Sequence, residues 1–290
     1  MSTRRNFLKN SGLAVVASNL AFRLDAAEQK MDGFSRNRIR HSVCRWCFQD
    51  LTIEELCTVG KEIGLEAIDL VGPSEFAALK KMGMHGSMVS PEGLKDFLKI
   101  GWNNPENHPH LVEFYEKLIT VSADAGFKNV ICFSGNRNGI DDERGLKNCA
   151  DGLKKIMQLA ENQGVTLMME LLNSKVDHHD YQCDHTAWGA NLAKEIGSQN
   201  FLLLYDIYHM QIMEGDVIRT IKDYGQYLGH FHTAGVPGRH EIDDTQELNY
   251  PAIMRAIADS NFSDFVAQEF IPTREDKLTS LRDAVKICTV

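Results

Sequence analysis

Four apolar runs in the second half of the sequence each end on a side chain that could bind a metal ion. The runs end at Glu170, Asp206, His232 and Glu269. Taken singly, each could instead be a solvated or capping carboxylate, or a structural histidine. Three carboxylates gathered in an apolar surrounding, however, destabilise the fold through desolvation and mutual repulsion unless a cation lies between them. The donor set is mostly oxygen, so we predict one divalent cofactor ion, Mn²⁺ or Mg²⁺, with Co²⁺ or Zn²⁺ also compatible.

A cation flanked by two glutamates suits proton transfer beside a carbonyl group. A metal chelated by the carbonyl and hydroxyl oxygens of a substrate stabilises an enediolate as a Lewis acid. One glutamate removes the proton, and the same or the other glutamate returns it to the neighbouring carbon. This chemistry interconverts an aldose with a ketose, or tartronate semialdehyde with hydroxypyruvate.

His230 competes with His232 for the role of metal ligand. The two residues are two positions apart, so they lie on the same side of a strand. We assign the ligand to His232, which is nearer the C-terminal end of the run, and expect His230 deeper, as a supporting or substrate-binding group.

Two further residues are candidates for substrate binding. Arg239 could donate two hydrogen bonds to a substrate carboxylate, although a loop ion pair with Glu241 or Asp243 is an equal alternative. Trp46 ends the first predicted strand and could form a pocket wall or simply pack in the barrel. The polar segment 177–185 follows a predicted strand, and we expect it to form a loop over the site.

The positioning elements alternate along the chain from residue 41 onward. Short β-rich runs alternate with amphipathic segments, which indicates βα units and a parallel sheet. We predict strands at 41–48, 67–71, 84–89, 129–133, 166–171, 202–206, 228–233 and 265–269. We predict helices at 52–63, 74–81, 110–125, 142–162, 186–196, 213–224, 250–260 and 273–288.

Eight strands and eight helices favour an α/β fold built as a single (β/α)8 TIM barrel, with an open doubly wound sheet as the alternative. A G-x-G-x-x-G phosphate loop is absent from the sequence. In a barrel the C-terminal ends of all strands surround one mouth, so the four strand-end residues would meet there despite their separation in sequence.

The first 27 residues differ from the rest of the chain. Arg4 and Arg5 precede an uncharged, moderately apolar run at 11–22, and Ala26 and Ala27 offer small residues for cleavage. The pattern predicts a twin-arginine signal at 1–27, with export to the periplasm, followed by a short extension at 28–40 and the catalytic barrel at 41–290. A basic amphipathic helix or a membrane anchor is the alternative, but the run is too short to cross a bilayer, so we expect no stable anchor.

Composition narrows the partners. The net charge is −9, and becomes −12 when residues 1–27 are removed, so a phosphate backbone would be repelled and nucleic acid is a poor candidate. A small hydroxy-carbonyl compound or sugar is the expected partner, and a homo-oligomer stays open. Seven cysteines are an odd number for a disulfide scaffold. Cys44 and Cys47 form a C-x-x-C pair, but the predicted strand places them on opposite faces, which disfavours a redox pair or zinc site.

Five short strings resemble the hydroxypyruvate isomerase family, within the xylose isomerase-like barrels and with ketose 3-epimerases as near relatives. They are E-L-L-N at 170–173, Y-D-I-Y-H-M-Q at 205–211, G-H-F-H-T at 229–233, P-G-R-H-E at 237–241 and Q-E-F at 268–270. The resemblance covers essentially everything after residue 27.

The resemblance implies a role for each matching residue. It places the metal on Glu170, Asp206, His232 and Glu269, makes Glu170 and Glu269 the acid/base pair, and places His209 and Arg239 on substrate oxygens. It departs at His232, where bacterial hydroxypyruvate isomerases carry glutamine and the epimerase relatives carry histidine.

The sequence leaves several functions open. Isomerisation of hydroxypyruvate is the first, and a ketose 3-epimerase or an inosose-type dehydratase would use the same metal and glutamates. An endonuclease acting on abasic DNA would require more histidines and a basic groove, and the negative charge argues against it. A non-catalytic alternative is an exported carbohydrate-binding protein whose metal only fixes the ligand.

Overall fold

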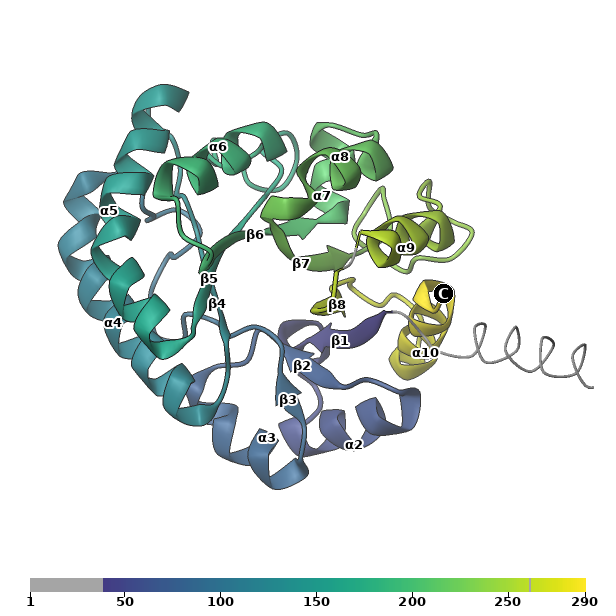
Figure 1. Ribbon diagram of the computed structural model, residues 1–290. Helices are drawn as coiled ribbons and strands as arrows, with labels where there is room; N and C mark the ends of the chain where they lie inside the picture. Colours follow the sequence, from purple (N-terminus) through teal and green to yellow (C-terminus); the bar gives the residue numbers. More distant parts are fainter. Residues whose placement is uncertain (1–38, 261) are drawn as a thin grey trace, which may run out of the picture. The chain divides into compact units, whose positions relative to one another are not determined.

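Eight parallel strands form the centre of the structure and bend into a barrel (Figure 1). The computed structural model describes residues 39–260 and 262–290, so the predicted signal at 1–27 and all but the last two residues of the predicted extension at 28–40 lie outside it. The strands are β1 (Arg40–Cys44), β2 (Ala67–Asp69), β3 (His85–Gly86), β4 (Asn129–Cys132), β5 (Thr166–Glu170), β6 (Phe201–Asp206), β7 (Leu228–Thr233) and β8 (Phe265–Gln268).

Val89 closes the barrel by joining the two ends of the hydrogen-bonded strand order. The hydrogen-bonded order runs β3-β2-β1-β8-β7-β6-β5-β4. Val89 forms parallel bridges to Val71 on one side and to Val130 on the other. Its amide donates to Asn129 O at 2.8 Å, and its carbonyl accepts from Ile131 N at 3.1 Å. The closure confirms the predicted (β/α)8 class and excludes the open sheet.

Helices surround the strands and cover the outer face of the barrel (Figure 1). They are α2 (Ile53–Ile63), α3 (Phe76–Met82), α4 (His108–Ala125), α5 (Asp142–Gln163), α6 (Thr186–Ile196), α7 (Ile207–Met213), α8 (Val217–Tyr224), α9 (Tyr250–Asp259) and α10 (Lys277–Cys288). Short 3₁₀ turns are η1 (Arg45–Phe48), η2 (Pro73–Glu75), η3 (Pro105–Asn107) and η4 (Gly225–Tyr227).

The first strand is shorter than predicted. It ends at Cys44, and residues 45–48 form the turn η1 instead of continuing the strand. The guanidinium of Arg45 donates to Phe48 O at 2.8 Å and to Leu51 O at 3.1 Å, which holds the chain in this turn. Trp46 therefore lies on η1 and not at a strand end. Cys44 and Cys47 do not share a strand, and both are free thiols.

The helix predicted at 213–224 corresponds to α8, and a separate helix, α7, precedes it. α7 begins directly after β6 because the carboxylate of Asp206 accepts from Tyr208 N at 2.8 Å and from His209 N at 3.2 Å, which caps the helix. Gly215, with a φ of 65°, separates α7 from α8. The last helix begins at residue 277 and not at 273, because the side chain of Asp276 caps its first turn.

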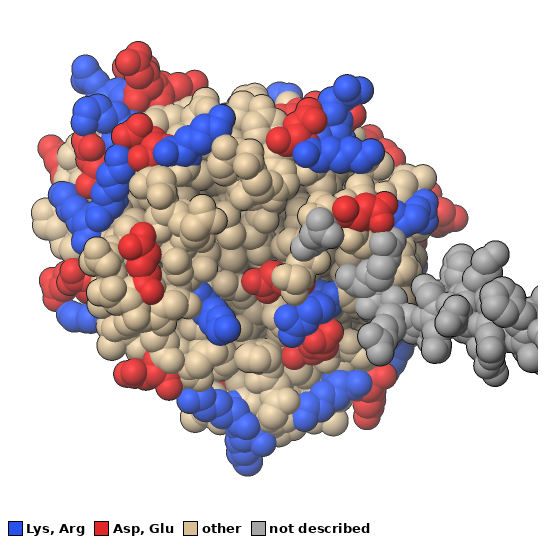
Figure 2. Space-filling view, in the orientation of Figure 1, with Lys and Arg blue, Asp and Glu red and all other residues tan. Residues whose placement is uncertain are grey.

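The outer surface is charged and mixed in sign. On the face shown in Figure 2, basic and acidic side chains alternate around the rim, over the helices. Within residues 39–260 and 262–290, every helix is too short or too polar to span a lipid bilayer.

A buried carboxylate joins two loops at the C-terminal end of the barrel. Glu241, in the loop between β7 and α9, accepts hydrogen bonds from the Thr273 amide and hydroxyl, both at 2.8 Å, and from Ser280 Oγ at 2.8 Å. Burial alone would raise the pKa of Glu241, but these hydrogen bonds outweigh burial and lower its pKa to about 2. The ionised carboxylate thus fixes the β7–α9 loop to the loop after β8.

Substitution of Glu241 should therefore destabilise the fold in a pH-dependent way. The folded-state pKa lies below the ordinary value, so the stabilisation is complete above about pH 4.5 and is lost as the pH falls toward 2. Urea unfolding of Glu241→Gln should show a loss of about 1–3 kcal/mol at pH 7. The difference in unfolding free energy between the variant and the wild type should be smaller at pH 3. Asp244→Asn, an exposed change in the same loop, is the control and should change the unfolding free energy little at either pH. A stability difference between Glu241→Gln and the wild type that does not change with pH would contradict this account.

Candidate functional site

The four strand-end residues predicted as metal ligands meet at one mouth of the barrel. Glu170 ends β5, Asp206 ends β6, His232 lies near the end of β7, and Glu269 follows β8. All four are buried, and one donor atom of each lies within 4.8 Å of the donor atoms of the other three. The register of the sheet contributes directly, because Asp206 is paired with His232 across β6 and β7.

The carboxylates in this cluster have too little positive charge beside them. Burial raises the pKa of Glu170 and raises that of Asp206 well above its ordinary value. Burial would raise the pKa of Glu269 as well, but the charges of Arg239 and His232 outweigh it and hold that pKa well below the ordinary range. Arg239 and a protonated His232 supply at most two positive charges beside three carboxylates, so at least one negative charge is left uncompensated.

The free donor atoms fit a divalent cation. Glu170 Oε1 and His232 Nδ1 are buried without a hydrogen-bond partner. His232 Nδ1 lies 2.8 Å from Glu269 Oε2 and 3.4 Å from Glu170 Oε1, so its lone pair would face two anions unless a proton or a metal ion lies between them. Three carboxylates and one imidazole nitrogen form a set that binds Mn²⁺ or Mg²⁺ and also suits Zn²⁺.

A fifth strand-end residue, Asp69, fixes the orientation of the histidine. Asp69 ends β2 and is fully buried. Its Oδ1 lies 2.9 Å from His232 Nε2, and its Oδ2 accepts from Ser87 Oγ at 2.5 Å and lies 2.8 Å from His230 Nε2. Burial opposes ionisation of Asp69, but His230 and His232 outweigh it and lower its pKa. Because the ionised carboxylate can only accept, the proton of His232 belongs on Nε2, and Nδ1 is left to face the glutamates.

Asp69 was missed at the sequence level, although the sequence contains the same signal as for the other four. An apolar run ends on a carboxylate at this position, but the predicted strand at 67–71 continued past it. The observed strand ends at Asp69, which brings its side chain to the same mouth.

Cys44, Asp69 and His232 form a second group with metal-ligand chemistry. Burial raises the pKa of Cys44 well above its ordinary value, so the side chain is a thiol and can donate to Asp69 Oδ1, 3.5 Å away. Both oxygens of Asp69 already accept hydrogen bonds. This group is therefore a hydrogen-bonded layer behind the metal-ligand cluster.

The loop after β7 holds Arg239 over the cluster. The backbone of Arg239 has a φ of 60°, in the left-handed region that favours glycine. Two hydrogen bonds hold it there: its amide donates to Gly235 O at 2.9 Å, and its carbonyl accepts from Ile271 N at 2.7 Å. Its guanidinium Nη2 lies 2.6 Å from Glu269 Oε2 and 3.4 Å from Asp206 Oδ2. Arg239 is thus oriented before any substrate binds.

The alternative partners predicted for Arg239 are wrong. Glu241 binds the loop after β8, as described above, and Asp243 pairs with Arg274 at 2.6 Å. The guanidinium of Arg239 instead lies near two aromatic rings, 5.2 Å from the centre of Trp46 and 5.4 Å from that of Tyr208.

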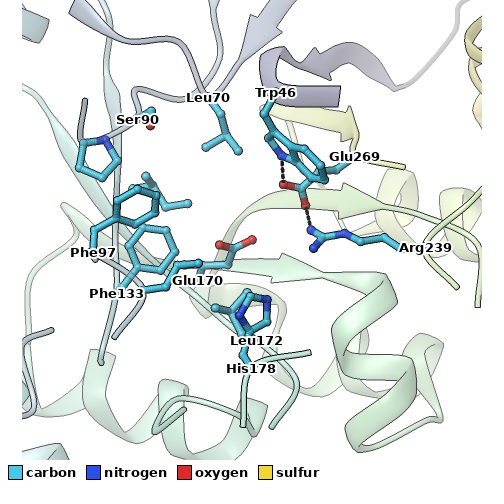
Figure 3. Close-up of a pocket in the computed structure, with 13 residues that line it drawn as sticks. Trp46, Leu70, Ser90, Phe97, Phe133, Glu170, Leu172, His178, Arg239 and Glu269 are labelled. Carbon is cyan, nitrogen blue, oxygen red and sulfur yellow. Dashed lines mark hydrogen bonds and ion pairs between the residues drawn. The ribbon is translucent and has the colours of Figure 1, made fainter. Parts of the chain in front are cut away.

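A cavity of about 280 Å³ opens beside the cluster (Figure 3). Trp46 forms part of its wall, and its Nε1 donates to Glu269 Oε1 at 2.8 Å. Both glutamates of the cluster contact the cavity, as does His178 from the predicted loop at 177–185. The lining residues are Trp46, Leu70, Ser90, Pro91, Phe97, Leu98, Ile131, Phe133, Glu170, Leu172, His178, Arg239 and Glu269.

Two residues predicted to touch substrate lie behind this lining. His209 is fully buried, accepts from Asn173 Nδ2 through Nδ1 at 2.6 Å, and has Nε2 3.5 Å from Asp206 Oδ2. Burial lowers the pKa of His209 well below its ordinary value, so it is neutral. His230 is also fully buried, beside Asp69. Both support carboxylates of the site from outside the cavity.

Comparison with known proteins identifies relatives of the same architecture. The sequence model of the xylose isomerase-like TIM barrel family matches residues 60–287. The chain is 36% identical to the 2-oxo-tetronate isomerase of Cupriavidus necator over 113 residues, which are 39% of this chain and 43% of that protein. It is 28% identical to the hydroxypyruvate isomerase of Escherichia coli over 155 residues, which are 53% of this chain and 59% of that protein. The match thus spans about half the length of these relatives.

Solved structures share the fold at low sequence identity. An AP endonuclease of family 2 from Brucella melitensis aligns with a TM-score of 0.75 at 19% identity, covering 85% of this chain and 97% of that one. The D-psicose 3-epimerase of Clostridium cellulolyticum aligns with a TM-score of 0.66 at 18% identity, covering 86% of this chain and 94% of that one.

The position of Asp69 leads to a test that does not depend on turnover. Asp69→Asn leaves the side-chain shape nearly unchanged but removes the anion that keeps the proton of His232 on Nε2. Titration calorimetry with Mn²⁺ should show affinity reduced by roughly 10–100-fold. Asp184→Asn removes a buried carboxylate that pairs with Arg137 elsewhere and should leave Mn²⁺ affinity unchanged. Equal affinity of Asp69→Asn and wild type would contradict the role of Asp69.

Proposed function

Because the chain belongs to the xylose isomerase-like TIM barrel family, we propose that it is a metal-dependent isomerase of a small hydroxy-carbonyl compound. The observation that carries this proposal is the meeting of Glu170, Asp206, His232 and Glu269 within 4.8 Å, with both glutamates open to the cavity. Relatives named 2-oxo-tetronate isomerase and hydroxypyruvate isomerase make these two compounds the first candidates, and hydroxypyruvate is our leading one.

The four residues would hold one divalent cation, Mn²⁺ or Mg²⁺ by their donor set. Asp206 offers Oδ2, since its Oδ1 caps α7, and His232 offers Nδ1, since its Nε2 is bound to Asp69. When bound, the cation supplies a Lewis acid that polarises a substrate carbonyl and stabilises negative charge on its oxygen.

The two glutamates differ in a way that suits proton transfer. Both oxygens of Glu269 accept hydrogen bonds, from Trp46 on one side and Arg239 on the other, which keeps this carboxylate ionised and fixed. Glu170 has a pKa raised by burial, so it holds a proton more readily than Glu269 does, and its second oxygen stays available for the proton when Oε1 binds the cation. Glu170 therefore takes the proton from the carbon beside the carbonyl, and Glu170 or Glu269 returns it to the neighbouring carbon.

Arg239 orients the substrate. Its guanidinium lines the cavity, so it can donate to a substrate carboxylate or hydroxyl oxygen. The same groups would serve a ketose 3-epimerase, in which the proton returns to the opposite face of the same carbon. The similar fold of the D-psicose 3-epimerase makes this the alternative function.

We further propose that the protein acts outside the cytoplasm. The paired Arg4 and Arg5, the apolar run at 11–22 and the small residues Ala26 and Ala27 support export by the twin-arginine route. Replacing both arginines by lysine should leave the full-length protein in the cytoplasmic fraction of a twin-arginine-competent bacterium, as judged by immunoblotting. Unchanged export of the variant would refute this route.

Proton exchange tests the catalytic assignment. In deuterated water, the Mn²⁺-loaded protein should incorporate deuterium beside the carbonyl of hydroxypyruvate or a ketose, as read by NMR, and chelation should stop the exchange. Glu170→Gln and Glu269→Gln should lower the rate by roughly 10²–10⁴-fold while the fold survives. Glu143→Gln, an exposed change on α5, is the control and should exchange at the wild-type rate. Near-normal exchange in both site variants would rule out the acid/base assignment.

A further inference from the structure

The cavity beside the cluster has two chemically different halves (Figure 3). Trp46, Glu269 and Arg239 lie on one side, with Glu170 next to them. Phe97 and Phe133 lie on the opposite side, and we call these two rings together with the apolar lining residues Pro91, Leu98 and Ile131 the apolar wall. The side chains of these five residues offer no hydrogen-bond donor or acceptor.

The apolar wall is preformed and open to the cavity. The rings of Phe97 and Phe133 lie with their centres 5.1 Å apart at an angle of 37°. Phe97 and Leu98 are only half-buried, although both face the interior of the barrel mouth. Their segment is joined to the loop after β4 by a hydrogen bond from Asn136 N to Lys99 O at 3.1 Å. The exposed carbon surface is thus a fixed feature of the site.

A three-carbon substrate does not account for this surface. The cavity, at about 280 Å³, is far larger than the ~30 Å³ that one water molecule occupies. A compound such as hydroxypyruvate occupies the polar half and leaves the apolar wall in contact with water. A longer chain of hydroxyl groups would lose its hydrogen bonds with water against this wall and find no partners there.

We propose that the site also accepts, and prefers to hydroxypyruvate, a hydroxy-carbonyl compound that carries an aromatic group at the end away from its reacting atoms, and that this group packs against Phe97 and Phe133. The inference rests on the proposed function, which supplies the reacting end at Glu170 and Glu269. An aromatic ring fits because offset or tilted packing on two phenylalanine rings adds attraction beyond the burial of apolar area. The specificity of the enzyme for its substrate thus resides in the apolar wall, and the reaction in the polar half.

A matched pair of compounds tests the proposal by binding, independently of turnover. The pair is dihydroxyacetone and its analogue in which one hydroxyl is replaced by phenyl, so that the hydroxy-ketone end is the same. Titration calorimetry on the full-length, Mn²⁺-loaded protein should show that the phenyl compound binds roughly tenfold or more tightly. Phe97→Ser should remove most of this preference and leave the affinity for dihydroxyacetone within about twofold.

Two further variants keep the test sharp. Leu98→Ser changes the same wall at another half-buried residue and should also reduce the preference, which guards against misfolding of Phe97→Ser. Ile100→Ser changes a neighbouring apolar residue that is 40% exposed and outside the cavity lining, and should leave both affinities unchanged. Equal affinity for the two compounds, no binding of either, or a phenyl preference that survives in both wall variants would overturn the inference.

Deuterium exchange on the same two compounds separates the inference from the proposed function. Exchange on both compounds without any phenyl preference in binding would contradict the proposed role of the apolar wall and would still agree with the proposed isomerase activity. Tight binding of the phenyl compound, lost in the wall variants, with no exchange in either compound would support the apolar wall and count against the isomerase.

Discussion

The structure of the site depends on one electrostatic constraint, the burial of three carboxylates at a single point with only one guanidinium beside them. Glu170, Asp206 and Glu269 come from three different strand ends, and Arg239 neutralises one of the three charges. Buried like charges are stable only when paired, protonated or bound to a cation. The unpaired Glu170 Oε1 and His232 Nδ1 mark the place where that positive charge belongs.

Successive layers of hydrogen bonds hold this arrangement in place. Asp69 fixes His232 from behind, and Trp46 and Arg239 fix Glu269 from the cavity side. Asp206 has two functions, because one oxygen caps α7 while the other faces the cluster. The loops that carry these groups are themselves anchored, so the site is organised before a ligand enters, which is the condition for electrostatic stabilisation of a reacting group.

Most of the metal-ligand cluster could be predicted from the sequence, because a parallel barrel brings the residues at the C-terminal ends of its strands together. Glu170, Asp206, His232 and Glu269 were identified in that way, and the barrel confirms that they meet. Asp69 was missed because the end of a short strand is poorly defined by pattern alone, and two residues of error placed it inside the strand. The apolar wall was missed for another reason. Phe97 lies in a loop without periodicity, and only tertiary packing brings its ring against Phe133.

The most direct test of the central claim is the position of a bound metal ion in a crystal of the Mn²⁺-loaded protein, located by anomalous scattering. The account predicts a single strong peak among Glu170, Asp206, His232 Nδ1 and Glu269, with His232 Nε2 still hydrogen-bonded to Asp69. A peak among Cys44, Asp69 and His232 Nε2, or full loading of the protein with no peak at the four ligands, would contradict it.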